Sequence, residues 1–158
     1  MKYISFLFVS LFFLSGCKPL FHNKTKQEGW LNIAVTDGVE VFTDTTSIRF
    51  EGAVAYAREK RVYTTDESRT TYTGKIKKEY AEMGKPENAG KWKDFSFCIY
   101  NCLYECTNKR FRVLSVEDYD SNGKLIQITP PKKPFVWLNV GTETVGDYTF
   151  FFVCDYRK

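Results

Sequence analysis

Apolar and polar residues alternate over six stretches of the chain, and this period of two is typical of β-strands with one buried face. Turn-forming residues separate the stretches, and Asp37-Gly38 predicts a tight hairpin between the first two. The predicted strands cover residues 30–35, 39–43, 53–64, 95–106, 110–119 and 124–129. Because short turns join most of these strands, we expect a mainly antiparallel sheet of about six strands.

The predicted strand over residues 53–64 carries a run of charges in its middle. Residues 58–61 (Arg-Glu-Lys-Arg) place charged side chains on both of its faces. Such charges are typical of a sheet edge, so we expect an edge strand or a protruding strand end. On propensity alone, a helix over residues 53–61 is the alternative.

Residues 65–92 interrupt the strand pattern with a polar, lysine-rich segment in which residues 75–83 predict a short helix. A segment this long is usually functional or disordered. Aromatic residues are interleaved with the lysines, which favours a partner-binding surface, because aromatic and cationic side chains often anchor interfaces. The alternative is a solvated loop whose aromatic side chains pack onto the sheet. The candidate surface residues are Tyr72, Lys75, Lys77, Lys78, Tyr80, Lys85, Lys91 and Trp92.

The last part of the chain contains a proline-rich segment followed by a predicted helix. Residues 130–134 contain three prolines, which cannot lie in a central strand, so we expect an extended crossover. Residues 142–155 predict a helix, with Thr142 or Thr144 as its N-cap. Three consecutive phenylalanines in this stretch would equally suit a buried strand.

The first sixteen residues have the features of a lipoprotein signal peptide. Lys2 supplies a positive charge, and residues 4–14 form an apolar run of about eleven residues, too short for a membrane-spanning helix. Residues 14–17 (Leu-Ser-Gly-Cys) resemble a lipobox, in which cleavage precedes a cysteine that carries a diacylglycerol thioether. An ordinary secreted protein with a chance cysteine at this place is the alternative.

This interpretation divides the chain into a signal peptide (residues 1–16), a lipidated Cys17 with a polar tether (residues 17–28), and a domain (residues 29–158). Lys18, and not an aspartate, follows the cysteine. This resembles the pattern of Gram-negative lipoproteins that are released to the outer membrane. We therefore expect a lipid-anchored protein of the bacterial outer membrane, at its periplasmic face or at the cell surface.

Charge and histidine content narrow the classes of function. Removal of the leader deletes one lysine and no acidic residue, so the formal charge falls by one from +4, which does not indicate nucleic-acid binding. His22 is the single histidine and lies in the tether, so the domain has none for a Ser-His-Asp triad, a Cys-His pair or an HExxH zinc site. We predict no catalytic residue, no metal site and no cofactor. Haem capture by the aromatic residues is an alternative, although the domain offers no axial histidine.

The remaining four cysteines, an even number in an exported domain, favour disulfides with three connectivities open. Cys98, Cys102 and Cys106 are spaced by four residues on one predicted strand. Four residues of strand span about 13 Å, whereas a disulfide requires Cα atoms within about 7 Å. A second pair, Cys98 with Cys102, therefore requires a bend in the strand, and Cys154 is the candidate partner of Cys106. The CxxxC spacing differs from the CxxC of thioredoxin-like sites, which argues against a redox enzyme.

Several short motifs, in this order, resemble the surface-adhesin protein E-like family of lipoproteins and exported proteins of Gram-negative bacteria. The matching residues are Trp30, Asp37, Gly38, residues 39–43, Ser47, Ile48, Glu105, Cys106, residues 110–116, Trp137, Val145, Gly146 and residues 152–154. The resemblance implies an α+β fold in which an antiparallel sheet packs against a C-terminal helix, with a disulfide between Cys106 and Cys154. Cys98, Cys102 and the lysine-rich insert depart from the family pattern.

The resemblance also implies a function, because the named member of the family binds host extracellular-matrix and serum proteins. We expect a non-catalytic outer-membrane lipoprotein that binds a protein partner, with the candidate residues between 72 and 92 as its contact surface. The competing hypothesis is a structural or accessory envelope lipoprotein that binds a partner of its own cell. The sequence leaves the oligomeric state open, a homodimer included.

Overall fold

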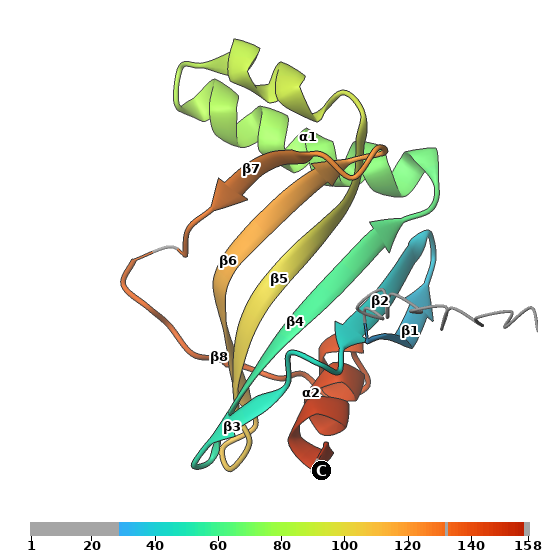
Figure 1. Cartoon of the computed structure of the whole chain (residues 1–158). Helices are drawn as coiled ribbons and strands as arrows, with labels where there is room; N and C mark the ends of the chain where they lie inside the picture. The colour runs from blue at the N-terminus through green and yellow to red at the C-terminus, as the bar shows by residue number, and fades with distance from the viewer. Residues whose placement is uncertain (1–28, 132, 157–158) are drawn as a thin grey trace, which may run out of the picture.

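The computed structural model describes residues 29–131 and 133–156. The predicted signal peptide (residues 1–16) and tether (residues 17–28), with Cys17 and His22, lie outside the described residues. Within the described part, eight strands form one sheet, and two α-helices and a 3₁₀ helix lie beside it (Figure 1). No helix of this part is both long and apolar enough to cross a membrane.

Every strand pair in the sheet is antiparallel, as predicted. The strands are β1 (Trp30–Thr36), β2 (Val39–Asp44), β3 (Arg49–Glu51), β4 (Val54–Tyr63), β5 (Phe95–Glu105), β6 (Arg110–Asp120), β7 (Leu125–Thr129) and β8 (Leu138–Asn139). Their order is β1-β2-β4-β5-β6-β7, with β3 paired to β4 and β8 paired to β6. The six predicted strands are confirmed, and the additional β3 and β8 are only three and two residues long.

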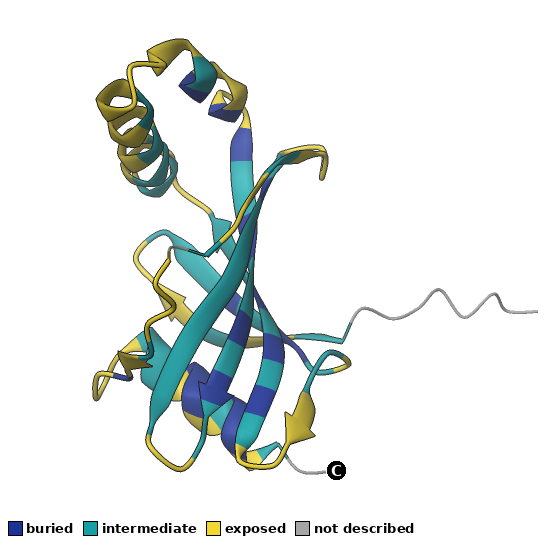
Figure 2. Cartoon of the chain, turned by 90° about the vertical axis from the view of Figure 1, so that its left-hand side faces the viewer, coloured by how far each residue is buried: buried dark blue, intermediate teal, exposed yellow. Residues whose placement is uncertain are grey.

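Both α-helices pack on the same face of the sheet. Strand register places Ala57, Cys102 and Val113 side by side on this face. The cluster that contains Ala57 and Cys102 packs against the C-terminal helix, and a second cluster around Phe95 and Cys98 packs against the first helix. The long central strands therefore form a continuous floor with one helix near each end, as Figures 1 and 2 show.

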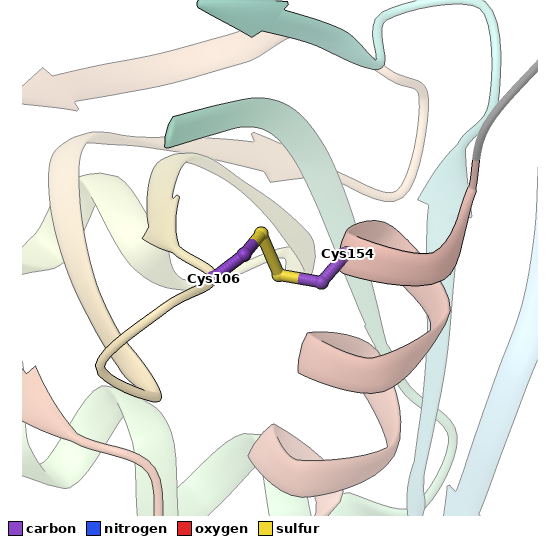
Figure 3. The surroundings of a disulfide bond; sticks show 2 residues. All are labelled: Cys106 and Cys154. Atoms are coloured by element: carbon purple, nitrogen blue, oxygen red, sulfur yellow. A yellow bond between two sulfur atoms is a disulfide. The ribbon is translucent and has the colours of Figure 1, made fainter. Parts of the chain in front are cut away.

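The C-terminal helix, α2 (Val145–Asp155), is stapled to this floor. The Thr144 side chain caps its first turn, as predicted for the Thr142 or Thr144 position. Its buried Phe150 and Val153 pack on the small side chains of β4, which allow the helix to approach closely. Cys154 in its last turn forms a disulfide with Cys106, and the two Cα atoms are 5.6 Å apart (Figure 3). The predicted pairing and the predicted fold class are confirmed.

Strand β4 lies in the middle of the sheet, so the prediction of an edge strand or protruding end is wrong. It pairs with β2 and β3 on one side and with β5 on the other. Its central charges are accommodated because Glu59 and Arg61 are two residues apart and point to the same face. The Arg61 Nη2 atom lies 3.4 Å from Glu59 Oε2. Glu59 is buried there, and the Arg61 guanidinium lies 4.3 Å from the centre of the Tyr100 ring. Two opposite charges that share one face of a strand are thus the signal that the sequence interpretation missed.

The opposite face of the sheet carries a polar network instead of a helix. Asn101 donates hydrogen bonds to Ser115 and Glu117, at 2.9 and 2.8 Å. The Arg58 guanidinium lies between Glu117 and Asp44, at 3.8 and 3.9 Å. These side chains satisfy one another's hydrogen-bonding and charge requirements on this face of the sheet.

Candidate functional site

The lysine-rich insert folds into a helical layer above one end of the sheet. Helix α1 (Asp66–Glu82) is longer than the predicted helix over residues 75–83 and is followed by the 3₁₀ helix η1 (Pro86–Trp92). Thr65 and Ser68 form a capping box at the start of α1, with Asp66 in the first turn. The polar residues that suggested a loop therefore start the helix, because their side chains satisfy backbone amides at its N-terminus.

A stripe of three α1 side chains faces the sheet: Tyr72, Ile76 and Tyr80. Their spacing of four residues puts them on one side of the helix. The Tyr72 hydroxyl donates to Asp118 Oδ1 at 2.7 Å, and the Tyr80 hydroxyl donates to Gln127 Oε1 at 3.0 Å. Aromatic side chains with polar ends thus dock α1 on β6 and β7, and α1 has no fully buried residue of its own.

Asp118 joins the two helical segments. Trp92, at the end of η1, is only 3% exposed and donates from its indole Nε1 to Asp118 Oδ2 at 2.8 Å. Each carboxylate oxygen of Asp118 therefore accepts one hydrogen bond, from Tyr72 and from Trp92. Burial raises the pKa of Asp118, and the two hydrogen bonds only partly oppose this shift. The sequence interpretation did not single out Asp118.

The insert therefore separates the candidate surface residues into two groups. The aromatic residues are docking groups: Tyr72 stacks on Phe95 with ring centroids 4.5 Å apart, and Tyr80 packs against Trp92. The alternative of aromatic side chains packed on the sheet is correct for these three, although the segment is helical. The lysines are exposed to solvent, and Figure 2 shows that α1 is mostly exposed on its outer side. The exposed lysines are Lys75, Lys77, Lys78, Lys85 and Lys91.

Cys98 and Cys102 are both free and buried. Strand β5 continues through them without the bend that a bond between them would require. Burial raises the pKa of Cys98 to about 12 and the pKa of Cys102 well above its ordinary value. A thiol with such a pKa is a weak nucleophile near neutral pH, so this pair has the properties of packing residues.

Thiol counting tests this assignment. In the mature protein we expect no reaction of Cys98 or Cys102 with a thiol reagent under native conditions, and reaction of both after denaturation. Rapid labelling of either thiol in the folded protein would show a reactive site and restore the redox interpretation.

The described residues offer little for metal chemistry. In this part of the chain no group of three or more His, Cys, Asp or Glu side chains lies in an arrangement that could hold a metal ion. Glu59, one of the buried carboxylates, is instead paired with Arg61.

Comparison with protein families gives a match over the same span as the fold. The family model for surface-adhesin protein E matches residues 30–155, from the first strand to the end of α2. The chain belongs to the surface-adhesin protein E family. Comparison with curated protein sequences finds no match.

Solved structures of protein E from Haemophilus influenzae share the fold. Crystal form II and the selenomethionine form both align with a TM-score of 0.50 at 13% sequence identity. Each alignment covers 82% of this chain, and it covers 89% and 88% of the two solved chains. At this identity the similarity establishes the protein E fold. Family membership adds that the chain is a surface-adhesin-like protein.

Proposed function

We propose that this chain is a lipoprotein anchored through Cys17 in the outer membrane, and that its domain binds a host extracellular-matrix or serum protein through the exposed lysines of α1, of η1 and of the turn between them. The single observation that carries the proposal is that the aromatic residues and the lysines of the insert occupy different environments. Its aromatic side chains hold the layer against the sheet, whereas its five lysines are exposed. Because the helical layer is already packed on the sheet, its backbone does not have to be ordered on binding, and the ordering cost is confined to the lysine side chains.

The five exposed lysines, here called the lysine layer, suit a partner with acidic segments. They are Lys75, Lys77, Lys78, Lys85 and Lys91. The Lys78 side chain is 80% exposed, and its Nζ lies 4.0 Å from a carboxylate oxygen of Glu82 on the next turn. Such an exposed pair contributes little to stability, so the lysine is available to exchange this carboxylate for one on a partner. Exposed charges of this kind affect the association rate and its salt dependence more than they affect the affinity of the final complex.

Charge reversal in the lysine layer is the direct test. We expect K75E/K77E/K78E to weaken binding of the mature protein to immobilised matrix and serum proteins by on the order of tenfold or more, with the loss mainly in the association rate. Surface plasmon resonance at two salt concentrations measures this, and wild-type binding falls as the salt concentration rises. The matched control is K124E/K133E, which reverses exposed lysines outside the layer and should bind as the wild type does.

Two results would contradict parts of the proposal. Equal binding by the triple variant and the wild type would exclude the lysine layer as the contact surface. Protection of the domain from added protease or antibody on intact cells would place it on the periplasmic side, and the partner would then be an envelope component of the same cell.

A further inference from the structure

The segment between β7 and β8 forms an apolar cleft on the helix-bearing face of the sheet. The cleft has a volume of 410 Å³, within the range of about 300–1,000 Å³ that is typical of small-ligand sites. Its floor consists of Tyr100, Val113 and Val116 from β5 and β6. Its walls come from the segment itself: Thr129, Pro130, Pro131, Pro134, Phe135, Val136 and Leu138.

The walls of the cleft are poor in hydrogen-bond donors. The three prolines have no backbone N–H, and the other wall residues carry mainly hydrocarbon side chains. Phe135 and Val136 remain 53% and 57% exposed although they are large and apolar. Neighbouring apolar side chains that stay exposed around a concave site are a feature of ligand-binding surfaces.

One cation lies in this apolar lining. The Arg112 guanidinium is 5.4 Å from the ring centre of Phe135 and 5.0 Å from that of Trp137. Its Nε is buried and finds no hydrogen-bond partner among the described residues. Arg110, by contrast, is paired with Glu105. A buried, unpaired donor is costly, so Arg112 is poised for an anionic acceptor.

We propose that the cleft binds a single acyl chain with a carboxylate head group, such as a long-chain fatty acid, and that Arg112 pairs with the carboxylate. A peptide fits the site less well, because every residue of its backbone brings a donor and an acceptor that the proline-rich walls cannot satisfy. An acyl chain brings no such groups along its length. The aromatic side chains of Phe135 and Trp137 orient the guanidinium at the head-group end.

The test uses the mature chain with C17S, which has no cysteine to carry the lipid and therefore needs no detergent. The probe is dodecanoate below its micellar concentration. Isothermal titration calorimetry should show saturable binding of one dodecanoate per chain, and dodecanol, which lacks the charge, should bind roughly tenfold more weakly. R112Q should lower the affinity for dodecanoate by roughly tenfold and leave dodecanol unchanged. R49Q is the matched control, because Arg49 stacks on Tyr56 away from the cleft.

Filling the cleft separates shape from charge. V116W should abolish binding of both probes; because this substitution alters a packed position, F135A at an exposed position provides a second variant that should weaken both. Thermal unfolding confirms that each variant is folded. No saturable binding of dodecanoate, equal affinity of R112Q and the wild type, or tighter binding of a pentavaline peptide than of dodecanoate would each overturn the proposal.

Discussion

Replacement of both Cys106 and Cys154 by serine will lower the free energy of unfolding by about 4 kcal/mol. The disulfide joins residues 48 positions apart and closes a loop that contains β6, β7, β8 and most of α2. In the chain-entropy model a loop of this length stabilises the fold by about 4 kcal/mol, because the reduced unfolded chain has more conformations. Urea unfolding of the wild type and of C106S/C154S measures the difference.

Reduction provides the control for this prediction. Dithiothreitol should lower the stability of the wild type to that of C106S/C154S and should leave the double variant unchanged. The staple also fixes α2, so the variant should lose protection from hydrogen exchange first in α2, where Phe150 and Val153 pack on β4. Equal unfolding free energies for the oxidised wild type and the variant would show that the helix packs without help from the bond.

Removal of the Asp118 carboxylate will loosen the whole α1–η1 layer. D118A leaves the Tyr72 hydroxyl and the Trp92 indole N–H without their acceptor, and we expect a loss of about 2–4 kcal/mol. Thermal unfolding measures the loss, and a change in tryptophan fluorescence, to which Trp30 and Trp137 also contribute, accompanies exposure of Trp92. The matched control is D94A, an exposed aspartate next to the same layer, which should change stability by less than about 0.5 kcal/mol.

The cost of D118A will depend on pH in a direction fixed by the pKa shift. The pKa of Asp118 is raised in the fold, so the folded protein binds more protons than the unfolded chain between the ordinary and the raised value. The stability that this group contributes is therefore fully present below the ordinary carboxyl pKa and is lost as pH rises through the raised one. D118A lacks this dependence, so it should be more destabilising at low pH than at neutral pH. If D118A costs the same free energy of unfolding at every pH, the pKa of Asp118 is not raised. Tryptophan fluorescence of the wild type that does not change with pH would support the same conclusion.

The raised pKa of Glu59 acts in the same direction, and for the same reason. Burial is its largest cause, and the Arg61 guanidinium opposes it. Comparison of the wild type with D118A removes this shared contribution, because Glu59 is present in both proteins. The pH-dependent part of the difference therefore belongs to Asp118.

The candidate surface could be predicted only in part, because orientation on a helix depends on what the helix packs against. The composition of residues 65–92 drew attention to its aromatic residues and its lysines, and the aromatic residues dock the insert on the sheet. The separation into docking aromatics and exposed lysines depends on Asp118, which is 46 positions from Tyr72 and 26 from Trp92. No local pattern contains such a contact.

The sequence by itself determined the elements whose causes are local. Alternation predicted the strands, Asp37-Gly38 predicted the first hairpin, and a threonine cap at residue 142 or 144 predicted the helix that the structure begins after Thr144. The spacing of Cys98 and Cys102 along an extended chain was enough to exclude a bond between them on a straight strand.

Only the tertiary structure decided where charge and apolar surface come together. It placed β4 in the centre of the sheet, because Glu59 and Arg61 pair on one face and β2 and β5 cover both edges. It also left Arg112 beside the cleft of the proline-rich segment. The physical reason is that strand order, helix docking and the burial of a charge are set by contacts between residues far apart in the chain, whereas turns, caps and alternation are set by neighbours.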